Sequence, residues 1–309
     1  MIVTVTMNPA IDKTVEIDRF IYQGLNRLKN VIQDVGGKGI NVSKTIKALG
    51  GNTVATGFLA GNAGAIVNKV LKEKGIKADF IGVDGETRTN MKVVEPGGIL
   101  TELNEPGPQV SDENVKKLMT KLEEYADENT LFILAGSIPQ GVPSNIYGTI
   151  IKKIKEKNAK VFLDADGELF VKAIEAGPSI IKPNKFELEQ YFGMENANEE
   201  KLIWMCKELQ KKGVNKVAVS MGKEGALFIW NDKVLKAQGL KVEAYSAVGA
   251  GDAMVAAISF GIDQGYDEEV CIRLGVAASA GAVMTKGTKP QEREIIDKLM
   301  KEVQLETIG

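Results

Sequence analysis

The chain has 309 residues, a formal net charge of −2, 44% hydrophobic and 26% charged residues, and no histidine. This length can bury a large core in one α/β domain or two smaller ones, and no segment carries the long basic run expected of a nucleic-acid-binding protein. The missing histidine excludes Ser-His-Asp and Cys-His catalysis and histidine-ligated zinc or iron, so any proton transfer falls to Asp, Glu, Lys, Tyr or Cys.

Short apolar segments bounded by turn residues alternate with longer segments of helical periodicity. The predicted buried strands are Met1–Thr6, Asn52–Leu59, Thr130–Ala135, Lys160–Leu163, Ser179–Ile181 and Lys216–Ser220. Helices are predicted after Gly37, after Ser111, after Ser144, and over Asp252–Gln264, Asp267–Met284 and Gln291–Glu302. This alternation predicts βαβ units and an α/β fold in which helices cover both faces of a mainly parallel central sheet.

Two stretches interrupt the alternation. Residues 12–35 contain two strand-like runs around Gly24, and residues 88–104 form a predicted hairpin around Pro96-Gly97-Gly98. We expect a small β-sheet that covers the carboxyl edge of the main sheet as a lid inserted into a single domain of residues 1–309; an extension of the main sheet is the alternative. Its exposed strand edges predict a homodimer through this lid sheet.

The two cysteines form neither a disulfide framework nor a metal-binding pattern, which fits a reducing compartment. The chain starts with a strand-like segment that lacks the features of a signal peptide, and its most apolar stretch, Leu274–Met284, is too short to span a bilayer. We therefore expect a cytoplasmic protein that binds neither membranes nor nucleic acid.

The strongest local signal for chemistry is Gly249-Ala250-Gly251-Asp252, which lies between a strand-like segment and a long helix. The glycines permit a tight turn that exposes N–H groups at a helix N-terminus, and such groups bind anions. Asp252 could take a proton from a hydroxyl while these amides stabilise a transferring phosphoryl group. The helix dipole favours an ionised Asp252 at neutral pH. A simple turn with an acidic residue near a helix end is the alternative.

A second glycine cluster, Gly36-Gly37-Lys38-Gly39, also precedes a helix. Its glycines allow close approach to a ligand, Lys38 could meet a phosphate, and Asn41 could bind sugar hydroxyls. A flexible turn with a solvated lysine is the alternative. Neither cluster completes a Walker A or GxGxxG motif, which argues against P-loop NTPases and Rossmann dehydrogenases.

Further candidate residues lie near predicted strand ends. Asn184 and Glu187 could reach a Mg²⁺-bound water or a phosphate, or could simply form a helix capping box. Arg88 could form a bidentate pair with an anion or lie solvated at the rim. Ser137 offers a hydroxyl after a strand, and residues 220–225 could hold a nucleotide or only form a turn.

These segments, in this order, resemble the ribokinase-like (phosphofructokinase B-type) sugar kinase family and its phosphosugar branch. The similar motifs are MNPAID at 7–12, GGKGIN at 36–41, TRTN at 87–90, GSIPQG at 136–141, IKPN at 181–184, SMGKEGA at 220–226 and AVGAGD at 247–252. The resemblance implies a three-layer α/β/α fold with a β-sheet lid, and transfer of the ATP γ-phosphoryl group to a phosphorylated ketohexose. Segments 26–28 and 101–108 look like those of enzymes that act on fructose 1-phosphate; tagatose 6-phosphate is the alternative acceptor and fructose 6-phosphate a more distant one.

The resemblance also implies roles for individual residues. Asp252 matches the catalytic base, and Gly249, Ala250 and Gly251 match the anion hole. The residues that match those binding the acceptor sugar and its phosphate in the family are Asp12, Gly37, Asn41, Lys38, Arg88 and Ser137, with Arg27 added as a cation on the lid. The nucleotide site matches Asn184, Glu187, Ser220, Gly222 and Gly225, with Glu187 holding Mg²⁺ through water.

Mg²⁺ enters with ATP as co-substrate, and the resemblance allows a monovalent cation as well. Asp166 and the segment Ser246-Ala247-Val248 depart from the family pattern and affect only the finer nucleotide and cation contacts. Two other functions remain open: a sugar-phosphate or nucleotide sensor on the same fold, which an intact Asp252 argues against, and a kinase for unphosphorylated sugars, which Arg88 argues against.

Overall fold

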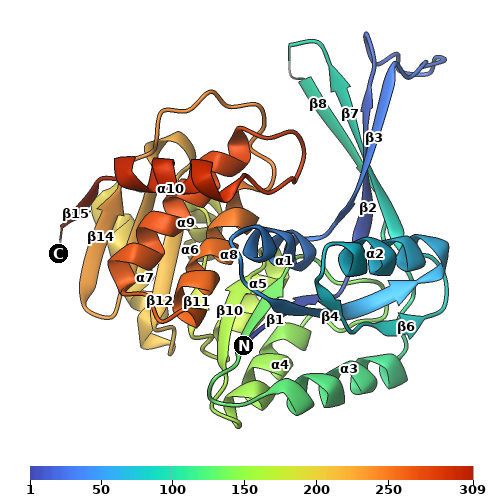
Figure 1. The fold of residues 1–309 in the computed structure, drawn as a ribbon. Coiled ribbons are helices and arrows are strands. Elements are labelled where there is room, and N and C mark those ends of the chain that lie inside the picture. Colours follow the sequence, from blue (N-terminus) through green and yellow to red (C-terminus); the bar gives the residue numbers. More distant parts are fainter. Residues whose placement is uncertain (98, 309) are drawn as a thin grey trace.

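A computed structural model describes residues 1–97 and 99–308 of the chain. Its large sheet contains β1 (Ile2–Thr6), β4 (Thr53–Ala60), β5 (Lys77–Ala78), β6 (Ile81–Val83), β9 (Leu131–Ala135), β10 (Lys160–Asp164), β11 (Ile180–Ile181), β12 (Lys216–Ser220), β13 (Ala226–Trp230), β14 (Lys233–Ala237) and β15 (Leu305–Thr307). The strand order is β15-β14-β13-β12-β11-β10-β9-β1-β4-β5, with β6 beside β4 (Figure 1). Pairing is parallel from β12 to β5 and antiparallel from β12 to β15, which confirms the mainly parallel sheet.

Helices cover both faces of the large sheet (Figure 1). One layer consists of α3 (Asp112–Tyr125), α4 (Ile146–Lys155), α5 (Gly167–Ile174), α6 (Lys185–Phe192) and α7 (Glu199–Lys211). The other contains α1 (Lys38–Ala48), α8 (Ala250–Asp263), α9 (Glu268–Val283) and α10 (Arg293–Glu302), and α2 (Gly61–Glu73) packs beside α1. Because strand side chains alternate between faces, Val3 and Val5 enter the first core while Ile2 enters the second. The chain therefore folds as the three-layer α/β/α arrangement expected from its sequence.

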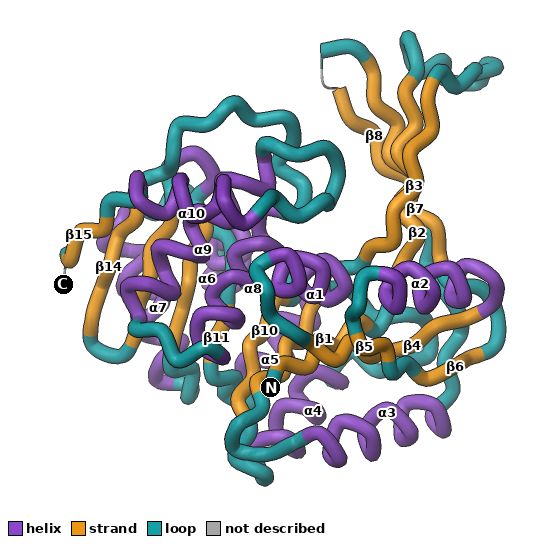
Figure 2. Tube along the Cα trace, viewed as in Figure 1, coloured by secondary structure: helices purple, strands orange, loops and turns teal. Residues whose placement is uncertain are grey.

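A separate small sheet projects from one edge of this body, with the order β3-β2-β7-β8 (Figure 1). Its strands are β2 (Ala10–Glu16), β3 (Asn30–Gly36), β7 (Arg88–Glu95) and β8 (Ile99–Asn104). Figure 2 shows that loops of the three-layer body lie on the side that faces the small sheet. The two interrupting stretches of the sequence thus form one sheet as expected, although Gly98 of the predicted turn lies outside the described residues.

One local detail differs from the sequence-based expectations. Helix α4 begins at Ile146 with Asn145 at its N-cap, not Ser144, and the Ser144 hydroxyl instead accepts from the Lys172 ammonium at 2.6 Å. The antiparallel edge formed by β13, β14 and β15 closes one side of the large sheet. None of the helices in the described part of the chain is long and apolar enough to cross a membrane.

Candidate active site

A cavity of about 600 Å³ lies where the carboxyl ends of the central strands face the base of the small sheet. Segments far apart in the sequence meet there, because the parallel strands all deliver their following loops to the same edge. Most of the residues expected at a site line this cavity: Asp12, Gly37, Lys38, Asn41, Arg88, Asn184, Glu187, Ser220, Gly222, Gly225, Gly249, Ala250, Gly251 and Asp252.

The first turn of α8 forms one wall of the cavity. Gly249 is the N-cap of this helix and has the left-handed backbone conformation (φ +84°), which explains the need for glycine there. The Ala250 amide donates to the Ala247 carbonyl at 3.4 Å, while the amides of Gly251 and Asp252 belong to a first turn, where N–H groups have no partner within the helix. The first turn of α8 therefore lines the cavity with Asp252 beside it, and anion binding at this turn stays a prediction.

Asp252 is almost completely buried, with 8% of its surface exposed. The side-chain amide of Asn41 donates a hydrogen bond of 2.8 Å to its carboxylate. Burial, followed by the charge of Asp164, raises the pKa of Asp252 to about 6, against the opposing effects of Asn41, Lys38 and Lys182. The helix dipole favours the ionised form, as expected from the sequence, but burial is the largest effect and moves the pKa upward. A carboxylate with this pKa is a stronger base that is still mostly ionised at pH 7.

A buried carboxylate between two lysines lies next to Asp252, and the sequence analysis did not single it out. Asp164, at the carboxyl end of β10, is 3.4 Å from the ammonium groups of both Lys38 and Lys182. Burial raises the pKa of Asp164, but the charges of Lys182 and Lys38 outweigh it and hold this pKa below its ordinary value. A Cβ on Gly251 would lie 3.1 Å from the Lys182 ammonium, so this cation lies directly beside the anion-binding turn. Two cations are thus fixed where a transferring phosphoryl group would meet the turn.

Arg88 provides a further cation that lines the cavity. Its Nε and Nη2 atoms donate to the Asn8 carbonyl at 3.2 and 3.0 Å, and Nη2 also donates to the Ser137 hydroxyl at 3.2 Å. Within the described residues Arg88 forms no ion pair with a carboxylate, although burial lowers its pKa. A half-buried guanidinium fixed in this way is suited to a phosphate on the ligand.

Other polar groups that line the cavity are suited to sugar hydroxyls. Asp12 accepts a hydrogen bond of 3.4 Å from Asn90 and forms an ion pair of 3.7 Å with Lys92. The side-chain carbonyl oxygens of Asn41 and Asn90 are buried and, among the described residues, have no hydrogen-bond partner. Because a buried acceptor without a partner costs free energy, these two oxygens mark positions where ligand hydroxyls would donate.

The part of the cavity at Asn184 and Ser220 is built from two loops held together by backbone pairing. Asn184 and Glu187 form a reciprocal capping box at the start of α6, with hydrogen bonds of 2.8 and 2.9 Å. Asn184 is paired with Ser220, and the following turn has glycines with positive φ at 222 and 225. A Cβ on Gly225 would lie 2.1 Å from the Ala237 carbonyl oxygen, so only glycine fits.

The residues in this part of the cavity fit a metal ion that arrives with a nucleotide. Burial raises the pKa of Glu187, whose carboxylate lines the cavity and uses one oxygen in the capping box. The described residues contain no cluster of three or more acidic or sulfur ligands that could hold a metal alone. Mg²⁺ commonly binds through one or two carboxylates, several waters and substrate phosphates, which agrees with this donor set.

Two of the predicted residues lie away from the cavity lining. Ser137 is exposed and accepts a hydrogen bond from Arg88, and Arg27 is exposed in the loop between β2 and β3. The sequence analysis missed Asp164, Lys182, Asn8, Asn90 and Lys92. A signal was present for Asp164 and Lys182, because both lie at ends of predicted strands.

The comparisons with known proteins agree with this geometry. Residues 4–294 match the model of the pfkB family carbohydrate kinases. The chain is 36% identical to the 1-phosphofructokinase of Bacillus subtilis over 99% of both chains, and 33% identical to the D-tagatose-1-phosphate kinase of Bacillus licheniformis over 93% of this chain and 94% of that one. Among solved structures, phosphofructokinase-2 from Escherichia coli in complex with potassium superposes with a TM-score of 0.92 at 25% identity, over 97% and 98% of the two chains. The protein therefore belongs to the pfkB family of carbohydrate kinases.

Proposed function

We propose that the protein transfers the γ-phosphoryl group of ATP to fructose 1-phosphate, giving fructose 1,6-bisphosphate and ADP. The observation that carries this proposal is that one cavity is lined by Asp252, the first turn of α8 and the cation Arg88, which contacts the Ser137 hydroxyl outside the lining. A candidate base and a separate cation in one cavity suit an acceptor that already bears a phosphate. The relatives named 1-phosphofructokinase favour the 1-phosphate over the 6-phosphate.

Before transfer, this chain's residues bind and orient the acceptor. Arg88 and Ser137 hold its phosphate, with Lys38 as a further cation, while Asp12 and the carbonyl oxygens of Asn41 and Asn90 accept from its hydroxyls. Such fixed positioning supplies much of the rate enhancement in phosphoryl transfer, because little covalent chemistry falls to the protein.

During transfer, the carboxylate of Asp252 takes the proton from the free primary hydroxyl of the acceptor. That oxygen forms a bond to the γ-phosphorus while the bond between the γ-phosphorus and the bridging oxygen breaks, and ADP leaves. The amides of residues 249–251, with Lys182 and Lys38 beside them, stabilise the charge on the transferring group. Glu187 would hold, through water, the Mg²⁺ that arrives with ATP, and this ion would supply neutralising charge at the nucleotide phosphates.

A coupled ADP-release assay tests the acceptor directly. Fructose 1-phosphate, fructose 6-phosphate, tagatose 6-phosphate and tagatose 1-phosphate are compared at equal concentration; the last is included because a relative is named for it. We expect the highest kcat/KM with fructose 1-phosphate. A higher value with another of these acceptors would replace the substrate, and no turnover with any of them would favour the sensor.

Arg88→Ala tests the binding of the phosphate. Loss of a charged hydrogen-bonding partner should raise KM for the phosphosugar by about tenfold or more, with KM for ATP nearly unchanged. Equal changes in both would contradict the role of Arg88 in binding the acceptor.

We further propose a cytoplasmic homodimer formed through the small sheet. Large apolar side chains are exposed on this sheet and its β2–β3 loop: Phe20, Ile21, Tyr22, Leu25, Leu28, Val31, Ile99, Leu100 and Leu103. Exposed apolar patches of this kind mark interfaces. Sedimentation should give a dimer at micromolar concentration, and a monomer would contradict the proposal. The monovalent cation also stays a proposal, tested by the dependence of the rate on potassium.

A further inference from the structure

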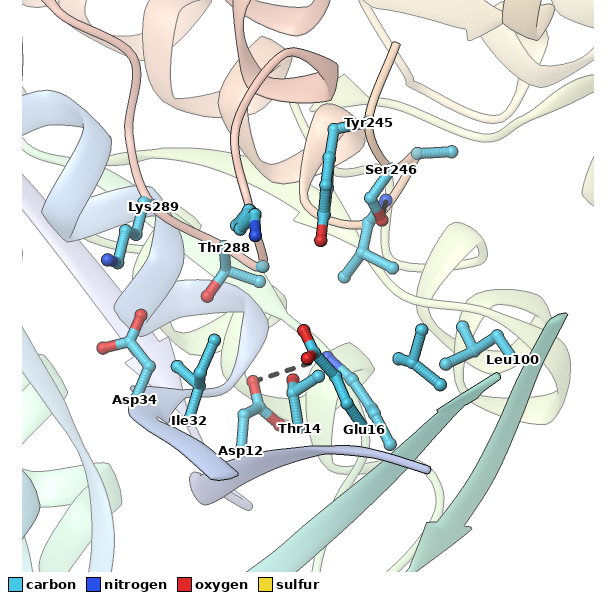
Figure 3. Close-up of a pocket in the computed structure, with 16 residues that line it drawn as sticks. Asp12, Thr14, Glu16, Ile32, Asp34, Leu100, Tyr245, Ser246, Thr288 and Lys289 are labelled. Atoms are coloured by element: carbon cyan, nitrogen blue, oxygen red, sulfur yellow. Dashed lines mark hydrogen bonds and ion pairs between the residues drawn. The ribbon is translucent and has the colours of Figure 1, made fainter. Parts of the chain in front are cut away.

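A second cavity, of about 610 Å³, lies between the small sheet and two loops of the body, residues 245–248 and 286–289 (Figure 3). It shares Asp12, Lys92, Ala247, Val248 and Thr288 with the cavity described above. Asp34 comes from the β3 wall, and Thr288 comes from the facing loop (Figure 3). One residue of helix α1 contacts both Asp34 and Thr288.

That residue is Lys44, whose charged group is buried and has no part in the mechanism above. Only 3% of its surface is exposed. Its ammonium donates to the Asp34 carboxylate and to the Val35 carbonyl, both at 2.9 Å, and to the Thr288 hydroxyl at 3.4 Å. All three donor positions of the ammonium are thereby used, on two separate elements.

On the small-sheet side, these contacts hold the strand that supports the acceptor-binding carboxylate. Asp34 lies directly opposite Asp12 in the pairing of β2 with β3. Its other carboxylate oxygen accepts from the Val35 amide at 2.8 Å, so Asp34 is fixed on both oxygens. Gly36, two residues after Asp34, lies close against Asp12, because a Cβ there would lie 2.2 Å from the Asp12 carboxylate. A shift of Asp34 would therefore move the backbone that packs against Asp12.

On the side of the body, the contact holds the loop that packs against the anion-binding turn. Thr288 is the neighbour of Gly249: a Cβ on Gly249 would lie 3.5 Å from the Thr288 methyl group. Lys44 also follows Asn41 by one helical turn, so the same face of α1 holds Asp252 and both of these elements.

A buried charge at this place calls for an explanation other than stability. Burial lowers the pKa of Lys44, and Asp34 opposes this effect. Replacing buried ion pairs with apolar side chains of similar volume is often neutral or stabilising, so the pair is weak evidence for a contribution to folding. Its contacts, by contrast, join the acceptor side of the active cavity to the phosphoryl-transfer side.

We propose that Lys44 is a positioning residue that sets the distance between the acceptor-binding base of the small sheet and the anion-binding turn at Gly249. It touches no substrate; it acts through Asp34 and Val35 on one side and through Thr288 on the other. The proposal rests on the kinase function proposed above but not on the identity of the acceptor.

The test separates the two arms by kinetics. Asp34→Asn should raise KM for the phosphosugar, and Thr288→Val should lower kcat. Lys44→Met should do both. Its kcat/KM for the acceptor should fall by roughly 10- to 100-fold, the range expected when reacting groups are misplaced. Lys44→Arg keeps the charge and several donors and should recover most of the activity. Adding Thr288→Val to Lys44→Met should lower kcat no further, because the contact is already lost.

Lys121→Met provides the matched control. Lys121 is paired with Asp79 at the edge of the large sheet, so this variant also removes one lysine from an ion pair but should leave kcat and both KM values unchanged. If Lys44→Met lowers the melting temperature but keeps kcat and KM within twofold of wild type, the pair has only a structural role and the proposal is overturned.

If the wild-type protein turns over none of the acceptors, the proposed function fails but the role of Lys44 can still be tested by a second measurement. Hydrogen exchange in Lys44→Met should speed up at residues 30–36 and 285–290 together, and it should not in Lys121→Met. Unchanged exchange in either segment overturns the positioning role.

Discussion

Asp252→Asn removes the proposed base and keeps its shape. The Asn41 amide can still donate to the oxygen of the new side chain, so the packing in the first turn of α8 is preserved. A positioned base usually contributes ~10²–10⁴-fold to the rate. We therefore expect kcat to fall at least about 100-fold in the coupled ADP-release assay.

The same substitution should make the protein more stable at neutral pH. The pKa of Asp252 is about 6 in the folded protein, against an ordinary value of 3.8, so the folded state binds this proton more tightly than the unfolded chain. The free energy of unfolding therefore falls as the pH rises from about 4 to about 6, and the loss persists at higher pH. About two pKa units at about 1.4 kcal/mol each give a cost of at most about 3 kcal/mol. Asn mimics the protonated form and avoids that cost.

Urea unfolding without ligands, at several pH values from 4 to 8, measures this gain. The difference between Asp252→Asn and wild type should be near zero at the lowest pH and largest above pH 7. Asp232→Asn, which changes an exposed carboxylate in the β13–β14 turn, is the control and should show no such trend. The reasoning is refuted if Asp252→Asn keeps more than about a tenth of the wild-type kcat, or if it is less stable than wild type at pH 7.5.

Three further predictions concern other parts of the site and the sheet. Asp164→Asn removes the negative charge that helps raise the pKa of Asp252 and leaves its two lysines in place, so the acidic limb of kcat/KM should move to lower pH; a move to higher pH would contradict this. Glu187→Gln should raise the Mg²⁺ concentration for half-maximal rate by roughly 10-fold with little change in KM for the phosphosugar, and an unchanged Mg²⁺ dependence would remove Glu187 from the metal site. Gly57→Ala should lower the free energy of unfolding by about 3 kcal/mol or more in denaturant titrations. The reason is that its Cβ would lie 1.9 Å from the Thr6 carbonyl oxygen, at a φ of +137°. A decrease of less than about 1 kcal/mol would show that β1 and β4 can separate there.

Much of the fold was predictable because its signals are local. The buried strands are short apolar runs between turn residues, and the glycines at 37 and 249 stand where the backbone has positive φ at a helix start. These same glycines predicted the anion-binding turn and the start of α1. A pattern of this kind needs no knowledge of which elements become neighbours.

The remaining features depend on neighbours that only the fold brings together. Asp164 meets Lys182 because β10 and β11 pair in parallel, with Leu163 opposite Ile181. The upward pKa shift of Asp252 could not be predicted for the same reason: the position of Asp252 near a helix start is visible in the sequence, whereas its burial and the charge of Asp164 are not. Nothing in the sequence singles out Lys44 within the predicted helix after Gly37.

The small sheet is joined to the body by short stretches of chain that also belong to the acceptor site. Strand β3 ends at Gly36 and α1 begins at Lys38, so a single residue, Gly37, separates the sheet from the helix that carries Asn41. On the other side, β7 starts at Arg88, the residue assigned to the acceptor phosphate. The backbone that joins the small sheet to the body is therefore also backbone of the proposed acceptor site. If the proposed function holds, a substitution at these joints that changes which sugar is accepted should also change how the small sheet is held against the body.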